Sequence, residues 1–147
     1  MLRASAVSPD RTPLFMKDSP SKQRSMLIRV NELELVAVLT STASAEELWH
    51  ALPLQAQANR WGDELYFSVP FQVPLETAAR AIVQAGDVAY WPDGPALCFF
   101  FGPTPVSRPG EIRAASAVNV CGTIRGNSAA LRQVADKAMV SLSRKEP

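Results

Sequence analysis

The sequence predicts a mainly β domain, and three observations support this prediction. Short segments rich in Val, Ile, Leu and aromatic residues recur along the chain, turn-forming residues separate them, and no apolar run reaches the ~18 residues of a membrane span. After residue 25 we count seven or eight such strand segments and two or three short helices. A closed barrel is the simplest arrangement that hides the edges of so many strands, and it is the expected architecture.

The chain divides at about residue 25 into a tail and a single domain. Residues 1–25 contain three prolines and five serines, lack an apolar period and carry a net charge of +3, whereas residues 26–147 sum to −2. A segment of this composition buries too little apolar surface to offset its ordering entropy, so we predict a disordered basic tail before a domain over residues 26–147. Translation starting at Met1 and translation starting at Met26 both remain open.

The first predicted elements are a hairpin and a short helix. Residues 27–30 and 33–39 are two strand segments rich in Leu, Ile and Val, with Asn31 near the turn between them. Residues 44–47 match the capping-box pattern S-x-x-E, which predicts a helix over residues 45–51.

The middle of the chain is predicted to contain an aromatic strand followed by a second helix. Turn residues at 61–64 precede a strand over residues 65–69, which Pro70 ends. Apolar residues then recur at helical spacing through residues 74–83, and Gly86 is available as a C-cap, so this segment is predicted to be helical.

The strongest hairpin signal joins residues 87–91 and 96–102 through the turn 92–95. Residues 97–101 lack the alternation of a half-exposed strand, which predicts burial on both faces.

The last part of the chain is predicted to hold a loop and three further elements. These are a proline-containing loop at 104–110, a β-branched strand over 116–124, a short helix over 129–134 and a closing strand over 138–142.

Four spaced motifs of this domain are similar to sequences of a known family. They are residues 61–68 (WGDELYFS), 86–92 (GDVAYWP), 96–105 (ALCFFFGPTP) and 117–120 (AVNV). Over about residues 26–143 they resemble a family of small microbial cyclophilin-like proteins. Residues 120–126 also resemble the F-G-x-V-x-x-G stretch of cyclophilins, with Cys121 in place of the usual aromatic residue. The resemblance implies a cyclophilin-like closed β-barrel of eight strands with helices capping its ends, and it implies no settled activity.

The resemblance raises the question of prolyl isomerisation. True cyclophilins use an arginine in an F-H-R-x-x-P strand; residues 65–70 (LYFSVP) match that motif best and place Phe67 at the arginine position. Residues 84–87 (QAGD) resemble the cyclophilin Q-x-G-D motif but lie 14 residues after the first one, further than in cyclophilins. The expected function is therefore binding without catalysis. The alternatives are a prolyl isomerase with a non-standard cation, Arg60 or Arg113, and an interaction subunit of a larger enzyme.

The expected ligand is a small molecule or a short proline-containing peptide, bound in a groove on the barrel. Ligand sites are mostly apolar with a few polar anchors, which fits the aromatic residues that flank the turns and the polar residues inside the motifs. The alternative role for the aromatic residues is packing in the core. The alternative for the polar residues is solvation or hydrogen bonding in a turn. The predicted groove residues are Arg60, Trp61, Glu64, Tyr66, Phe67, Tyr90, Trp91 and Asn119.

Other chemistry is not expected, so we predict no catalytic residue, no metal and no cofactor. His50 is the only histidine and has no nucleophile or metal-ligand motif around it. Cys98 and Cys121 each lie in an apolar strand, which is typical of buried thiols in a reducing, cytoplasmic compartment. The net charge of +1 gives no basic footprint for nucleic acid, and no membrane partner is expected. The oligomeric state stays open.

Overall fold

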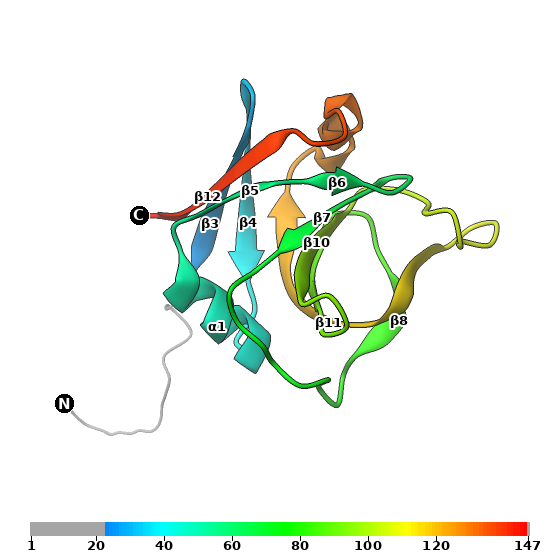
Figure 1. Ribbon diagram of the computed structural model, residues 1–147, viewed down its shortest axis with the longest axis horizontal. Helices are drawn as coiled ribbons and strands as arrows, with labels where there is room; N and C mark the ends of the chain where they lie inside the picture. The colour runs from blue at the N-terminus through cyan, green and yellow to red at the C-terminus, as the bar shows by residue number, and fades with distance from the viewer. Residues whose placement is uncertain (1–22, 147) are drawn as a thin grey trace.

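The structure is a computed structural model that describes residues 23–146. The predicted tail, residues 1–25, falls almost entirely outside the described residues, and Ser25 already opens the first strand. The described part of the chain contains ten strands, one α-helix and one 3₁₀ helix (Figure 1). The strands are β3 (Ser25–Val30), β4 (Leu33–Leu39), β5 (Leu54–Gln57), β6 (Asn59–Arg60), β7 (Glu64–Ser68), β8 (Arg80–Val83), β9 (Asp87–Trp91), β10 (Ala96–Phe100), β11 (Ile112–Arg125) and β12 (Met139–Lys145), and the helices are α1 (Ala43–Ala51) and η1 (Ser128–Gln133).

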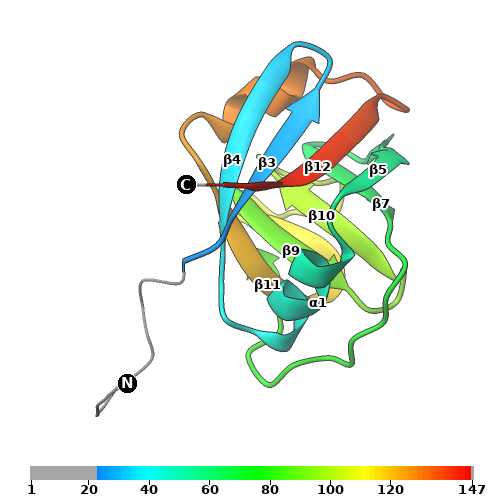
Figure 2. The same ribbon diagram turned by 90° about the vertical axis from the view of Figure 1, so that its left-hand side faces the viewer.

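The ten strands form one antiparallel sheet with the order β5-β12-β3-β4-β11-β9-β10-β7-β6, and β8 pairs with β11 alone. The sheet curls around a common core, with α1 near one end and η1 near the opposite end (Figures 1 and 2). The strands at the two ends of this order, β5 and β6, are separated in the chain only by Ala58. Within the described residues no hydrogen-bonded pairing joins them, so the mainly β fold is confirmed, whereas the expected closed eight-stranded barrel is not.

The two predicted hairpins are present. Strands β3 and β4 pair from Ser25 to Val30, and Asn31 lies in the turn with a φ of 57°, a left-handed conformation that asparagine tolerates better than most residues. Strands β9 and β10 pair with Trp91 opposite Ala96. Neither described helix is both long enough and apolar enough to span a bilayer.

The predicted helix over residues 74–83 is wrong. Its first part is turn and irregular chain, and its last part is β8. The apolar residues that suggested a helix share no buried face, because Leu75 is 57% exposed and Ile82 is 40% exposed. The segment is instead held from outside: the side-chain oxygen of Asn119 accepts a hydrogen bond from the backbone N–H of Glu76 at 2.8 Å. Tertiary pairing therefore outweighs the local period here.

Helix α1 forms as predicted, but its N-cap differs. The helix begins at Ala43, and the Thr42 hydroxyl accepts the capping hydrogen bond from the backbone N–H of Ala45 at 3.2 Å. Ser44 is buried, and its hydroxyl donates to the carboxylate of Glu76 at 2.6 Å. The predicted capping role of Ser44 is wrong because this buried bond to a distant segment takes its hydroxyl.

Strand β10 is buried on both faces, as the sequence predicts. Leu97 and Phe99 point into the main core, while Cys98 and Phe100 point to the opposite face of the sheet. There they belong to a second cluster of buried residues, defined by Val83, Ala89, Cys98, Phe100, Ala114 and Val118.

Truncation of Phe99 measures how much the main core contributes to the stability of the fold. Its buried ring meets that of Phe67 edge-on, with the centroids 5.5 Å apart. Because Phe99→Ala leaves a cavity among packed strands, we expect the free energy of unfolding to fall by about 3–5 kcal/mol, measured by urea unfolding. The control Val106→Ala, at an exposed loop position, should change it by at most about 0.5 kcal/mol. A loss below about 1 kcal/mol for Phe99→Ala would contradict this packing.

Candidate ligand-binding site

A cavity of about 120 Å³ lies on the side of β7, β9 and β10 that faces away from the main core. Its walls are largely aromatic and aliphatic. The residues come from the loop before β7, from these three strands and from the first half of β11. The lining residues are Trp61, Glu64, Tyr66, Trp91, Cys98, Phe100, Ala114, Ala115 and Val118.

Strand register brings the lining residues to one face. Strand β10 pairs with β7 so that Glu64 stands opposite Phe100 and Tyr66 opposite Cys98. Because side chains alternate along a strand, these four residues share the outer face, to which β9 adds Trp91. The first half of β11 pairs with β8, apart from the rest of the sheet, and supplies the other wall (Figure 1).

The turn before β7 depends on glycine. Gly62 has a φ of +61°, and a Cβ there would lie 2.8 Å from the Pro105 ring and 3.0 Å from the Pro103 carbonyl oxygen. The backbone N–H of Trp61 donates to the carbonyl of Glu64 at 2.9 Å and closes the turn. This tight turn places Trp61 and Glu64 beside the same cavity.

Trp91 is held by a chain of hydrogen bonds between two walls of the cavity. Its indole N–H donates to the Ser116 hydroxyl at 2.7 Å, and that hydroxyl donates to the carboxylate of Asp93 at 2.9 Å. The bonds join the end of β9 to β11, so they fix the indole position without occupying the cavity.

Glu64 is the polar group of the cavity. Its side chain is 5% exposed, and burial raises its pKa to about 7, an effect that a hydrogen bond from the Cys98 thiol only partly offsets. The Oε1 atom is buried without a hydrogen-bond partner. Near neutral pH the carboxyl group therefore exists in both protonation states, and it can accept or donate a hydrogen bond to a bound molecule.

The thiols and the histidine offer no reactive group here. Burial, followed by the charge and hydrogen bond of Glu64, raises the pKa of Cys98 well above its ordinary value. Burial also raises the pKa of Cys121. His50 is exposed and contacts Glu46 at 2.8 Å. Within residues 23–146 no group of His, Cys, Asp and Glu side chains is arranged to hold a metal ion.

The structure brings four of the eight predicted groove residues to the cavity, namely Trp61, Glu64, Tyr66 and Trp91. The other four do not line it. Phe67 and Tyr90 are each 1% exposed and point into the main core, because they alternate with Tyr66 and Trp91 along their strands. Tyr90 also donates from its hydroxyl to the Phe71 carbonyl at 3.2 Å. Asn119 is buried between α1 and the 74–79 segment, where its amide donates to Ser44 and Pro74.

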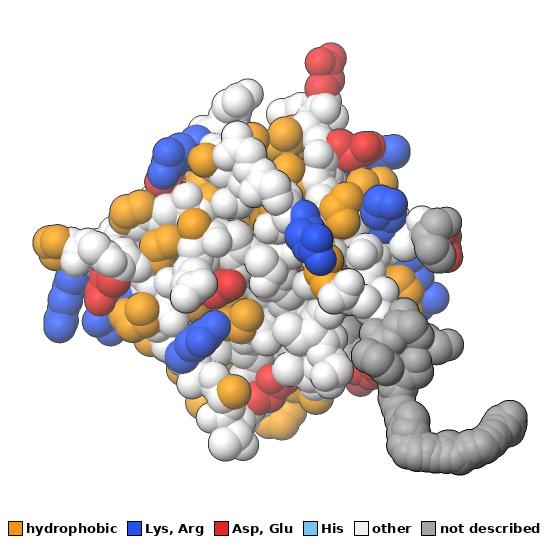
Figure 3. Space-filling view, turned by 180° about the vertical axis from the view of Figure 1, so that it is seen from behind, with side chains coloured by type: hydrophobic (Ala, Val, Ile, Leu, Met, Phe, Trp, Pro, Cys, Tyr) orange, Lys and Arg blue, Asp and Glu red, His pale blue; other side chains and the backbone are white. Residues whose placement is uncertain are grey.

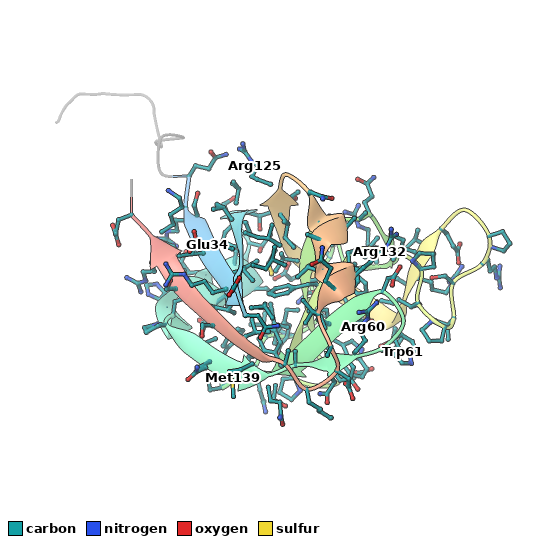
Figure 4. All side chains as sticks on the ribbon, turned by 90° about the horizontal axis from the view of Figure 1, so that it is seen from above. Glu34, Arg60, Trp61, Arg125, Arg132 and Met139 are labelled. Atoms are coloured by element: carbon teal, nitrogen blue, oxygen red, sulfur yellow. The ribbon has the colours of Figure 1, made fainter. Side chains whose placement is uncertain are left out.

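Arg60, the fourth residue outside the cavity, is bound to the neighbouring loop. Its guanidinium donates to the Val134 carbonyl at 2.9 Å, pairs with Asp63 at 3.0 Å and lies over the Phe101 ring, 5.1 Å from the centroid. Figure 4 shows it beside the helix that carries Arg132, whose carbonyl it also contacts at 3.1 Å.

Arg113, the other candidate cation, pairs with Glu111 at 2.7 Å. Neither Arg60 nor Arg113 lines the cavity. On the face seen in Figure 3, acidic and basic side chains are interspersed rather than gathered by sign.

Sequence reasoning missed five lining residues: Cys98, Phe100, Ala114, Ala115 and Val118. The lack of alternation along β10 indicates that both faces of the strand are buried, and this signal could have identified Cys98 and Phe100. It does not say which face holds a cavity. The three residues of β11 carry no local signal, because their position depends on the pairing of β11 with β8.

Comparison with known proteins defines the class. The model of the Cyclophilin-like family matches residues 24–143, and the chain belongs to the cyclophilin-like family. Among solved structures, the solution structure of a hypothetical protein from Archaeoglobus fulgidus is 39% identical, with a TM-score of 0.71; the match covers 84% of this chain and 95% of that one. No curated protein matches the chain.

The buried carboxyl group predicts an unusual pH dependence of stability. The pKa of Glu64 is raised from 4.5 to about 7 in the folded state, so between these values the folded protein binds more protons than the unfolded chain. The free energy of unfolding should therefore fall as pH rises from about 5 to 8, by up to about 3 kcal/mol from this group. Glu64→Gln removes this contribution, because the amide stays neutral.

Urea unfolding of wild type and Glu64→Gln at pH 5 and pH 8 measures how the free energy of unfolding of each protein depends on pH. Burial also raises the pKa of Asp87, but that contribution is present in both proteins and cancels in the comparison. Glu32→Gln, at an exposed position of the β3–β4 turn, is the matched control and should retain the wild-type pH dependence. Equal pH dependence in wild type and Glu64→Gln would contradict the burial of an ionisable Glu64.

Proposed function

We propose that the protein binds a small molecule, or a single side chain of a short peptide, in the cavity beside Glu64, without catalysis. The observation that supports this most is the combination of aromatic walls with one buried carboxyl oxygen that lacks a partner. Binding sites for small molecules are typically mostly apolar and contain few polar groups that fix orientation. Buried polar atoms are almost always paired, so one without a partner beside a cavity supports a functional role for its residue.

The size of the cavity limits the group it can hold. An engineered cavity of about 150 Å³ in another protein accepts benzene, so a cavity of about 120 Å³ suits one small ring or a compact branched group. The rest of a larger ligand would lie outside, toward the exposed Ala115.

Binding is preferred to prolyl isomerisation because no cation from the described part of the chain lines the cavity. An isomerase of the cyclophilin type needs a positive group at the imide nitrogen, whereas the guanidinium groups of Arg60 and Arg113 are paired with Asp63 and Glu111. The cyclophilin arginine position is occupied here by Phe67, whose side chain points into the main core.

Two small probes, cyclopentanol and cyclopentylamine, test the proposal by NMR. We expect at least one of them to shift the indole N–H signals of Trp61 and Trp91, which line the cavity. The signal of Trp49 is the internal control and should not move, because that ring packs against Arg24 and Arg144 on another part of the surface.

A steric variant localises the binding. Ala115→Phe should abolish these shifts by filling the mouth of the cavity, because Ala115 is exposed and lies in its lining. Ala78→Phe, an exposed position outside the lining, should leave binding intact. If neither probe shifts Trp61 or Trp91 at millimolar concentration, the proposal of a binding cavity is wrong.

A further inference from the structure

Glu64 Oε1 is the one buried side-chain oxygen or nitrogen in the described part of the chain that has no hydrogen-bond partner. Buried polar atoms are almost always paired, since leaving one unpaired is costly. The exception belongs to a residue that lines the cavity. A hydrogen-bond donor on a bound ligand would provide a partner for this carboxyl group.

The cavity also lacks a positive charge to balance Glu64. The titratable groups that face it are the Cys98 thiol on β10, whose pKa burial raises well above its ordinary value, and the Tyr66 phenol on β7, while β9 and β11 contribute only apolar or indole side chains. Among the described residues, 23–146, no Lys, Arg or His lines the cavity. A buried carboxylate is stable only when a cation or several donors accompany it, whereas the donor that contacts Glu64 among these walls is the Cys98 thiol.

The remaining walls suit a cation. Trp61, Tyr66, Trp91 and Phe100 provide four aromatic rings around a cavity of about 120 Å³. The faces of aromatic rings carry partial negative charge and attract ammonium groups, tryptophan most strongly. An anionic ligand would instead set a second negative charge beside Glu64, which is unfavourable in a partly dry site.

We infer, on the basis of the proposed function, that the ligand is a compact organic amine that binds in its protonated form. Its ammonium N–H donates to the Glu64 carboxylate, and its apolar body packs among the aromatic rings. One group thus supplies both the missing donor and the missing positive charge.

The affinity for an amine ligand should change with pH in one direction. An ammonium ligand prefers ionised Glu64, whose pKa in the free protein is raised to about 7 by burial. An alkylamine stays protonated throughout this range. Its affinity should therefore rise from pH 5 to pH 7 and level off above pH 8. A ligand that accepts a hydrogen bond from protonated Glu64, such as an amide, would show the opposite trend.

A matched pair of probes and one variant test the inference. Cyclopentylamine and cyclopentanol have the same ring and differ in charge, and their dissociation constants can be compared by titrating the indole signals of Trp61 and Trp91. At pH 7.5 we expect the amine to bind at least about tenfold more tightly than the alcohol, since a hydrogen bond to a charged group is the stronger kind. Glu64→Gln should weaken the amine by about ten- to a hundredfold and the alcohol by less than about threefold.

The outcomes separate this inference from the proposed function. Equal binding of the two probes, or amine binding that is unchanged in Glu64→Gln, would overturn the amine assignment and leave the binding cavity in place. Failure of both probes to bind wild type would overturn the two together. An unchanged Trp49 indole signal in Glu64→Gln shows that the variant is folded, so a selective loss of amine binding supports the inference.

Discussion

The burial of strand β10 on both faces is the constraint on which the rest of the structure depends. One face, with Leu97 and Phe99, completes the main core, and the other, with Cys98 and Phe100, would be exposed to water if nothing covered it. The first half of β11 and its partner β8 provide that cover. The cavity lies between this cover and the sheet, so the same strand organises both the core and the candidate site.

Glu64 occupies a position that stability alone would assign to an apolar residue. It stands opposite Phe100 on a buried face, where ionisation is unfavourable and one oxygen has no partner. A group of this kind lowers stability near neutral pH. Strongly perturbed ionisable groups concentrate at functional sites, where function compensates for this loss of stability. Arg60 shows the contrasting structural case, since its guanidinium is paired with Asp63 and with backbone carbonyl groups.

The sequence predicts those features that arise from neighbouring residues. Alternation and turn chemistry identify the β3–β4 and β9–β10 hairpins, and the unbroken apolar run in β10 indicates its two buried faces. Features set by distant contacts are not predictable in this way: residues 74–83 have a helical period but are held by Asn119, and Ser44 bonds to Glu76 instead of capping its helix. Likewise, alternation places Tyr66 and Phe67 on opposite faces of β7, but only the pairing of β11 with β8 shows which of the two faces borders the cavity.

An ionisable carboxyl group lies in a mostly apolar cavity that no cation of residues 23–146 lines, and we propose that a ligand supplies the positive charge. A carboxyl ¹³C NMR titration, with the Glu64 signal assigned by its loss in Glu64→Gln, tests this most directly. We expect a midpoint near pH 7 in the free protein and a clearly lower midpoint when cyclopentylamine is bound. A midpoint near 4.5 in the free protein, unchanged by the amine, would contradict it.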